Sequence, residues 1–549
     1  MRKKYVLPAV LAAIGALLLA ASAFAGVNRS TGNAGKVAKK GGTLRVNVAN
    51  NDFEFTDPGL AYDTLSWSML YTADVLLVNY PEKNGQEGGQ LYPEGATAFP
   101  LVSKDGKTYT FTIRPGLKFS DGSAVTAASF QRAFERILSP KMGSPVGVNI
   151  GLQDVIKGGA DFLAGKTQKI SGVVAKGQKL TFTLVKPNAT FVSIAAMQWF
   201  GAVKASTPYS EAGLLTQPSA GPYYIKARDI GKSLVEVRNP YYKGTRPSNP
   251  DQIVWTVNTD QDQGLLQVKA GQVDIDASGP PPTSNADLGA QFGVNKKQFY
   301  VGPTSCVLYW AMNTSRAPFS SLAARKAVEW GLDRPATIRL LGKYAGKRTD
   351  QILVPGIPGF NDFHLYAIKG ADVAQAKKVG GAAISGTVTV FHSGSAVGIA
   401  GAQIAEYNLK QVGFETKDRL VPGSIYYKTL GTKGVDFDLA RAGWCADYFD
   451  PFDYINVLLD GRSIQDANNV NFAYYNNASL NAAMDKAANL SGAARAKAYQ
   501  ALDLNVMKNH APWAPYSVLS DVFFTSSRVS NWVYSPYFGE PAFNALAVG

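Results

Sequence analysis

Residues 105–123 read DGKTYTFTIRPGLKFSDGS, a stretch in which short apolar runs alternate with turn signals. The dipeptides at 105–106 and 121–122 are both Asp-Gly, which favours tight turns between β-strands. From 109 to 113 every second residue is large and apolar, so these side chains share one face of an extended strand. Pro115 and Gly116 then break the strand. The stretch therefore predicts a meander of β-hairpins.

An amphipathic helix is predicted directly after this meander. Thr126 can cap its first turn, and Ser-Pro at 139–140 ends it. Apolar residues follow the cap at helical spacing, at Phe130, Ala133, Phe134, Ile137 and Leu138. Elsewhere, residues 42–48 alternate apolar and polar side chains and predict a strand, and a second hairpin is expected to turn at 230–231.

The remaining patterns favour a large α/β protein. The segment LAARKAVEWGLDRPATIRLLG at 322–342 predicts two helices broken at Asp333, with Pro335 at the first position of the second helix. Strands therefore alternate with helices along the chain, which is typical of a mixed α/β architecture. A chain of 549 residues exceeds the roughly 250–300 residues at which single cores stop growing, so we expect at least two lobes.

The N-terminal residues predict export. Three basic residues at 2–4 precede an apolar run at 5–21, and Ala-Phe-Ala at 23–25 is a small-x-small cleavage site. We therefore expect a signal peptide at 1–25 and a flexible leader at 26–40. An uncleaved membrane anchor is the alternative, because the apolar run approaches the roughly 20 residues that span a bilayer. No cysteine follows the run, so a lipoprotein is not expected.

Charge and cysteine content narrow the function further. The formal net charge is +14, but seven basic and no acidic residues fall within 1–40, and the remaining surplus is scattered, so nucleic-acid binding is not expected. The chain is 46% hydrophobic and 17% charged, which indicates a globular protein and excludes disorder.

Exported proteins form disulfides in an oxidising compartment, so the two cysteines, Cys306 and Cys445, predict a structural disulfide.

The sequence offers no catalytic or metal-binding motif. The three histidines are widely spaced and none belongs to HExxH, and no GxSxG is present. In GGADFLAGKT at 158–167 the glycines are one position too far apart for a phosphate-binding loop. We therefore expect a binding protein and not an enzyme, and we expect it to use neither a cofactor nor a metal ion.

Four stretches, in order along the chain, resemble one known family. They are YTFTIRPGLKFSDGSAVTAASF (109–130), GPYYIKARDIGKSLVEVRNPYYKG (221–244), AARKAVEWGLDRPATI (323–338) and RAGWCADYFDP (441–451). Together they resemble the family-5 extracytoplasmic solute-binding proteins of peptide-type ABC transporters. The last stretch, with PTSCVLYWAMNTSRAPFSS around Cys306, is similar to the oligopeptide-binding branch. The resemblance runs from about residue 41 to the C-terminus.

The resemblance implies a two-lobed, periplasmic-binding-protein-like α/β fold with a hinge and an extra subdomain on the first lobe. Lobe I is then expected at 41–66, 205–300 and 522–549, the extra subdomain at 67–204, and lobe II at 301–521. It also implies the substrate-binding component of an ABC importer, which captures short peptides in the cleft between the lobes and delivers them to a membrane permease. We expect such a receptor to be a monomer in the periplasm or at the cell surface.

The resemblance further implies a ligand site in RAGWCADYFDP. Asp447 would hold the α-ammonium group of the ligand, and the backbone of Gly443, Trp444 and Cys445 would pair with the ligand's main chain as an added strand. Trp444 would also form the floor of a side-chain pocket. Arg441 matches a position that can receive a ligand carboxylate.

Each of these assignments has an alternative. Asp447 could cap the turn before Asp450-Pro451, Arg441 could pair with a nearby acid, and Trp444 could be a core residue. After Tyr448 the sequence departs from the oligopeptide pattern, which puts the far end of the ligand in doubt. A receptor of the same fold for a metal chelate, an opine, a glycan or a cell-wall peptide is the second interpretation, and a secreted hydrolase is a remote third.

Overall fold

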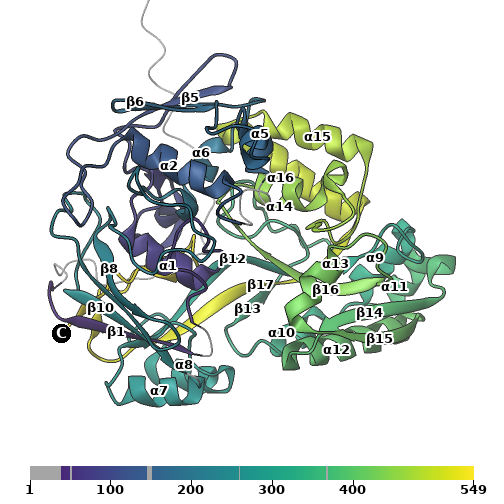
Figure 1. Ribbon diagram of the computed structural model, residues 1–549. Coiled ribbons are helices and arrows are strands. Elements are labelled where there is room, and N and C mark those ends of the chain that lie inside the picture. The colour runs from purple at the N-terminus through teal and green to yellow at the C-terminus, as the bar shows by residue number, and fades with distance from the viewer. Residues whose placement is uncertain (1–38, 50–51, 145–150, 259, 367–368) are drawn as a thin grey trace, which may run out of the picture. The chain divides into compact units, whose positions relative to one another are not determined.

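The computed structural model describes nearly all of the residues that follow the predicted leader (Figure 1). The residues that it describes are 39–49, 52–144, 151–258, 260–366 and 369–549. The predicted signal peptide at 1–25, and the predicted leader except for its last two residues, lie outside them. None of the helices in these ranges is both long enough and apolar enough to cross a membrane.

The first sheet has five strands in the order β11-β1-β10-β9-β8. β1 runs parallel to β10 and β11, and β9 pairs antiparallel with β10 and β8. The strands are β1 (Thr43–Ala49), β8 (Tyr223–Asp229), β9 (Ser233–Arg238), β10 (Gln252–Asn258) and β11 (Ile275–Asp276). Helices α7 (Gln261–Lys269) and α8 (Asn285–Phe292) lie beside it (Figure 1). The strand predicted at 42–48 and the hairpin around 230–231 are confirmed.

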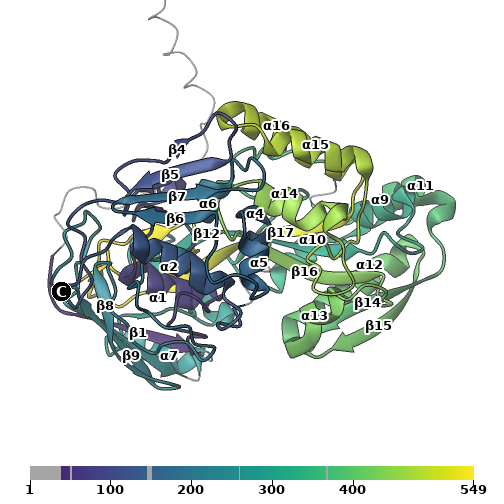
Figure 2. The same cartoon turned by 45° about the horizontal axis from the view of Figure 1, so that its top comes forward.

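A four-stranded antiparallel sheet contains the opening stretch of the sequence and has the order β4-β5-β7-β6. Its strands are β4 (Leu101–Val102), β5 (Thr108–Thr112), β6 (Val173–Lys176) and β7 (Lys179–Thr183). They lie above helix α2 (Ala127–Leu138) in the view of Figure 2. Phe111 and Ile113 are completely buried, as their shared face predicts. The short helices α4 (Leu152–Val155), α5 (Gly159–Leu163) and α6 (Phe191–Ile194) follow α2 in the chain.

The predicted ends of α2 are confirmed. Of the predicted hairpins before it, the first forms paired strands and the second does not. Thr126 is the N-cap of α2 and Ser139 its C-cap, as predicted. β5 pairs with β4 across the predicted turn, but its other neighbour is β7, about seventy residues further along the chain. After Pro115, which has no N–H to donate, the chain makes only an isolated bridge between Lys118 and Ala124.

The third sheet has six strands in the order β13-β17-β12-β16-β14-β15. Its strands are β12 (Phe299–Met312), β13 (Gly346–Arg348), β14 (Thr387–Ser393), β15 (Glu415–Val421), β16 (Leu439–Cys445) and β17 (Trp513–Phe524). β12 lies antiparallel between β16 and β17, whereas β14 is parallel to β15 and β16. The two long strands, β12 and β17, run side by side through the predicted lobe boundaries at 300/301 and 521/522.

Helices cover both faces of this sheet. One face packs on α9 (Leu322–Gly331), α11 (Val373–Gly380) and α12 (Ala396–Val412), in a core that includes Trp310. The other packs on α14 (Phe452–Leu459), α15 (Ala478–Ala488) and α16 (Gly492–Asn509), in a core that includes Tyr309. Neighbouring residues of β12 therefore pack into opposite cores, because side chains alternate between the two faces of an extended strand.

The predicted helix pair at 322–342 is present, with one correction. α9 ends at Gly331, and Asp333 caps α10 (Arg334–Arg339) by accepting a 2.9 Å hydrogen bond from the Ala336 amide. α10 starts at Arg334, so Pro335 occupies its second position and not its first. A proline is accommodated in the first turn because the amides there have no partner within the helix.

The remaining α-helices and β-strands are short. They are helices α1 (Thr64–Ala73) and α13 (Tyr426–Leu430) and the strand pairs β2 (Val78–Asn79) with β3 (Tyr92–Pro93), β18 (Val529–Ser530) with β21 (Ala547–Val548), and β19 (Tyr534–Ser535) with β20 (Glu540–Pro541). A single apolar core joins residues of the five-stranded and four-stranded sheets and includes Val46, Phe111 and Phe543.

Candidate ligand-binding site

A disulfide marks the place where β12 and β16 leave regular pairing. Cys306 lies directly opposite Cys445 in the register of the two strands, and the two sulfurs are bonded. The predicted disulfide is therefore confirmed, and it links neighbouring strands of the six-stranded sheet. β16 ends at Cys445, so the next residues of the motif, 446–451, form a loop whose start the disulfide fixes.

A cavity of about 670 Å³ opens beside this loop. That volume falls within the roughly 300–1,000 Å³ of clefts that bind small molecules. One wall consists of residues of the six-stranded sheet and its loops, at Thr304, Ser305, Cys306, Tyr427, Lys428, Gly443, Trp444, Cys445, Ala446, Asp447, Asn468, Asn469, Val470 and Phe472. The rest of the lining comes from Tyr62, from Thr64 and Trp67 of α1, from Asp521 of β17 in the same sheet, and from the C-terminal residues Tyr537, Phe538 and Glu540.

Four of the five predicted site residues line this cavity. They are Gly443, Trp444, Cys445 and Asp447. Arg441 is not among the lining residues, and its Nε donates a 2.9 Å hydrogen bond to the hydroxyl of Tyr516. Its role as a receptor for a ligand carboxylate therefore stays a prediction.

Two contacts of Asp450 bear on the alternatives that the sequence left open. Asp450 forms an ion pair of 2.7 Å with Arg495, so it is not the partner of Arg441. Asp450 also caps the turn that follows it, because its Oδ1 accepts a 2.9 Å hydrogen bond from the Phe452 amide. Asp447 itself lines the cavity, and its Oδ2 accepts a hydrogen bond from Tyr62.

Asp453, a buried residue in the first turn of α14, holds the loop from behind. Its Oδ2 accepts a 3.1 Å hydrogen bond from Trp444 Nε1 and a 2.9 Å hydrogen bond from the Asp447 amide. One carboxyl oxygen thus fixes both the indole that lines the cavity and the backbone that carries Asp447. Burial, with the charge of Asp447 as a smaller cause, raises the pKa of Asp453 well above its ordinary value.

Asp447 has no cationic partner among the described residues. Its Oδ2 accepts a 3.4 Å hydrogen bond from the hydroxyl of Tyr62, a long contact that lies near the limit for such bonds. Burial raises the pKa of Asp447, because removal from water disfavours the carboxylate. A partly buried carboxylate without a cation is stabilised when a ligand brings one.

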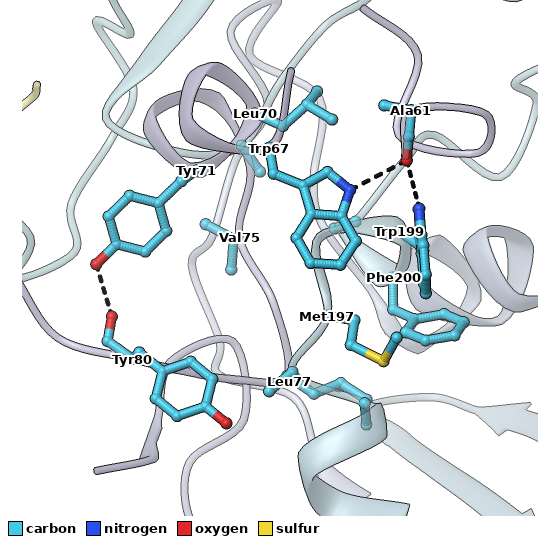
Figure 3. Close-up of a cluster of buried hydrophobic side chains, with 14 of the residues drawn as sticks. Ala61, Trp67, Leu70, Tyr71, Val75, Leu77, Tyr80, Met197, Trp199 and Phe200 are labelled. Atoms are coloured by element: carbon cyan, nitrogen blue, oxygen red, sulfur yellow. Dashed lines mark hydrogen bonds between the residues drawn. The ribbon is translucent and has the colours of Figure 1, made fainter. Parts of the chain in front are cut away.

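Tyr62 is held by an aromatic cluster that includes Trp67 and Trp199, the two indoles labelled in Figure 3. The indole nitrogens of Trp67 and Trp199 both donate to the carbonyl oxygen of Ala61, the residue before Tyr62. The Tyr62 ring stacks on Trp199 with 5.1 Å between ring centroids, and Trp67 meets Trp199 edge to face at 4.9 Å. Since these rings are largely buried, Tyr62 presents its hydroxyl to Asp447 from a rigid base.

Tyr80 holds the loop after Asp447 and is itself held by two other tyrosines. The hydroxyl of Tyr80 accepts a 3.2 Å hydrogen bond from the Phe449 amide, and the Tyr80 ring stacks on Tyr537 at 4.1 Å. Figure 3 shows the hydroxyl of Tyr71, in α1, donating to the carbonyl oxygen of Tyr80, at 2.6 Å. The loop that carries Asp447 is thus held by residues far away in the sequence.

Sequence reasoning missed two other acids in the cavity, Asp521 of β17 and Glu540 of β20. Burial raises the pKa of Asp521 to about 7. Burial also raises the pKa of Glu540 well above its ordinary value, with Asp521 as a smaller cause. One signal was available, because Asp521 is the single charged residue in the apolar strand WAPYSVLSDVFF. Lys428 was also missed, and it is the only basic residue among the described residues that line the cavity.

Nothing in the described ranges resembles a metal centre, since no three His, Cys, Asp or Glu side chains gather there as metal ligands. The chemistry that the cavity offers is instead that of carboxylates, aromatic rings and free backbone groups at a strand end. Such a lining suits an organic cation with an amide backbone.

Known proteins resemble this chain in sequence. Residues 90–466, more than half of the chain, match the model of the family described as bacterial extracellular solute-binding proteins, family 5 Middle. The probable D,D-dipeptide-binding periplasmic protein DdpA of Escherichia coli (strain K12) is 26% identical over 74% of this chain and 76% of its own. The oligopeptide-binding protein OppA of Bacillus subtilis (strain 168) is 24% identical over 81% of this chain and 82% of its own.

Solved structures share the fold. The clavulanic acid biosynthesis oligopeptide binding protein 2 has a TM-score of 0.85 at 23% identity and covers 93% of this chain and 96% of its own. The periplasmic murein tripeptide binding protein MppA, in an unliganded open form, has a TM-score of 0.76 at 24% identity over 94% and 99%. The predicted two-lobed α/β fold is thereby confirmed.

Proposed function

Because the chain belongs to the bacterial extracellular solute-binding proteins of family 5, we propose that it is the peptide receptor of an ABC importer. It captures short peptides and delivers them to permease subunits in the membrane. Relatives whose names specify a dipeptide or an oligopeptide as ligand support this choice of solute. The observation that carries the proposal is the Asp447 carboxylate, which lines the cavity and has a tyrosine hydroxyl, but no cation of the described residues, as its partner.

A peptide would use two features of the cavity at once. Its α-ammonium group would form a charge-assisted hydrogen bond with Asp447. Its main chain would pair with the exposed backbone of residues 443–445 as an added strand, which supplies affinity without reading side chains. Trp444 and Tyr62 offer apolar surface on either side for the first side chains.

We assign the ligand's carboxylate to one of two basic groups, Lys428 of α13 or Arg441 of β16. Lys428 lines the cavity and is exposed, so it can reach a ligand without leaving a partner among the described residues. Arg441 is the predicted receptor and lies in β16, outside the lining of the cavity, with its Nε on the hydroxyl of Tyr516. Either group would fix the length of the bound peptide.

Closure of the two lobes is part of the proposal. We assign lobe I to 41–66, 205–300 and 522–549, the extra subdomain to 67–204, and lobe II to 301–521. The hinge then lies in β12 and β17, whose pairing has a register shift between Pro303 and Val307. A ligand that contacts Asp447 on one side and Tyr62 on the other stabilises the closed state.

The experiment is calorimetric titration of the mature, ligand-free protein with Ala-Ala-Ala and with its N-acetylated form. The free-amine peptide is expected to bind, and acetylation is expected to abolish binding. Asp447→Asn should weaken binding of the free-amine peptide by about tenfold or more, because a charge-assisted hydrogen bond is lost. Asp287→Asn, an exposed acid in α8, is the matched control and should bind as the wild type does.

Equal binding of both peptides contradicts the role of Asp447, and no binding of either contradicts a peptide receptor. The second interpretation, a non-peptide solute in the same cavity, would then be favoured. We further propose that the protein acts as a monomer outside the cytoplasm, without catalytic activity, after removal of residues 1–25 and without a lipid anchor. Intact peptide recovered after prolonged incubation would support the non-catalytic role.

A further inference from the structure

Asp521 and Glu540 are two carboxylates that the proposed peptide contacts do not use. Both line the same cavity as Asp447. Within the described parts of the chain, neither side chain has an ion pair or a hydrogen bond, and Glu540 Oε2 is shielded from solvent without any partner. Buried polar atoms are almost always satisfied in folded proteins, so an orphan of this kind in a binding cavity points to a missing donor.

The backbone brings these two acids together. An added Cβ at Gly539 would lie 2.9 Å from Asp521 Oδ2, so the carboxylate of Asp521 rests against the residue directly before Glu540. Gly539 also has a φ of +72°, which favours glycine. Asp521 comes from the long strand β17 and Glu540 from the short β20, so two separate elements support the pair.

The cavity around the pair suits an organic cation. Tyr537 and Phe538, the largely buried aromatic residues just before Glu540, line the same cavity and give the acids an apolar surrounding, in which an unpaired carboxylate is costly. Lys428 is the cavity's basic residue, but it forms no ion pair with either acid in the described structure. A single α-ammonium group at Asp447 would leave Asp521 and Glu540 without a cation.

We propose that Asp521 and Glu540 form a second cation subsite, which receives a basic side chain of the bound peptide. The receptor then prefers peptides that carry a lysine-type ammonium or an arginine-type guanidinium group over neutral peptides. This inference rests on the proposed function, since it assumes that a peptide occupies the cavity. It adds a specificity that the α-ammonium contact alone does not supply, because every peptide has that group.

The test compares peptides that differ only in one charge. Calorimetry would measure tripeptides of alanine with one lysine at the first, second or third position, each beside its Nε-acetyl-lysine counterpart. At one position at least, the lysine peptide should bind about tenfold or more tighter than its acetylated counterpart, as expected for a charge-assisted contact. Arginine and citrulline at the same position distinguish a guanidinium preference from an ammonium preference.

Asp521→Asn and Glu540→Gln should each reduce this preference, and the double variant should abolish it. Asp287→Asn and Glu415→Gln, two exposed acids in α8 and β15, are matched controls that should retain it. Thermal melts of all variants check that each is folded. The wild-type comparison needs no variant, so the proposal can fail even if a variant does not fold.

The outcomes separate the two proposals. If the free-amine alanine peptide binds but no lysine peptide exceeds its acetylated counterpart, the cation subsite is wrong and the peptide receptor stands. A lysine preference that persists in the double variant also overturns the subsite. If no peptide binds, both proposals fail.

Discussion

The hydroxyl of Tyr537 donates a 2.7 Å hydrogen bond to the carbonyl oxygen of Asp447. The two residues are ninety positions apart, and Tyr537 is almost completely buried, with 3% of its surface exposed. The bond therefore joins a C-terminal segment to the loop that presents the cavity's first acid. Its strength decides how firmly Asp447 is held before a ligand arrives.

Tyr537→Phe should lower the free energy of unfolding by about 1 kcal/mol, because the Asp447 carbonyl loses its donor in a buried environment. Urea denaturation measures this change. Tyr407→Phe is the matched control, since Tyr407 is 64% exposed, and it should leave the free energy unchanged. Equal effects of the two substitutions would contradict a specific role for the Tyr537 hydroxyl.

Asp521 is expected to make the ligand-free protein less stable as pH rises. Its pKa is raised to about 7 by burial, whereas an unfolded aspartate titrates near 3.9. Between these values the folded state holds a proton that the unfolded state has lost, so the free energy of unfolding falls from about pH 4 to about pH 7 and then levels off. Asp521→Asn removes this penalty.

The Asn variant should therefore be more stable than the wild type by about 2 kcal/mol above neutral pH, after allowance for the partial exposure of the carboxylate. At about pH 4 the two proteins should be closer in stability, since Asp521 is then neutral in the folded state. Urea denaturation at both pH values measures the difference. A difference that does not change with pH would contradict the titration of Asp521.

Asp453→Ala should weaken peptide binding by about tenfold, because Trp444 and the Asp447 amide both lose their acceptor and the wall of the cavity loosens. Asp453→Asn retains an acceptor oxygen of nearly the same shape, so the expected loss is smaller. Calorimetric titration with a free-amine tripeptide compares the two. If both variants bind as the wild type does, Asp453 does not position the site.

Removal of the disulfide should destabilise the protein through its unfolded state. Cys306 and Cys445 are 139 positions apart, and in the loop-entropy model a bridge of this span contributes at most about 4–5 kcal/mol. A Cys306→Ser, Cys445→Ser double variant should therefore melt at a lower temperature than the oxidised wild type. A reductant should lower the melting temperature of the wild type and leave the variant unchanged. No difference between the two proteins would mean that strand pairing alone supplies the stability.

Local signals predicted the local elements well. β1, the hairpin of β8 and β9, α2 with its Thr126 cap, and the break at Asp333 all follow from alternation, turn dipeptides and capping residues. These features depend on neighbours a few residues apart. The pairing of β5 with β7 was missed because nothing in either strand specifies a partner at such a distance.

The residues of the candidate site were likewise predicted where they are close in sequence and missed where they are distant. The motif at 441–451 predicted four residues that line the cavity, because they lie within five positions at the end of one strand and the start of its loop. Tyr62, Asp521 and Glu540 come from three other segments, and only the folded chain brings them to the same cavity. Arg441 shows the reverse case, because its place in the motif did not reveal the contact of its Nε with Tyr516.

The position of Trp444 in the cavity wall should also give the protein an optical signal of ligand binding. Trp444 lines the cavity, whereas Trp199, Trp255, Trp310 and Trp513 are fully buried. A bound molecule displaces water from the exposed side of the Trp444 indole and leaves those four rings in unchanged surroundings. The intrinsic emission of the protein therefore serves as a gauge of occupancy, readable without any label.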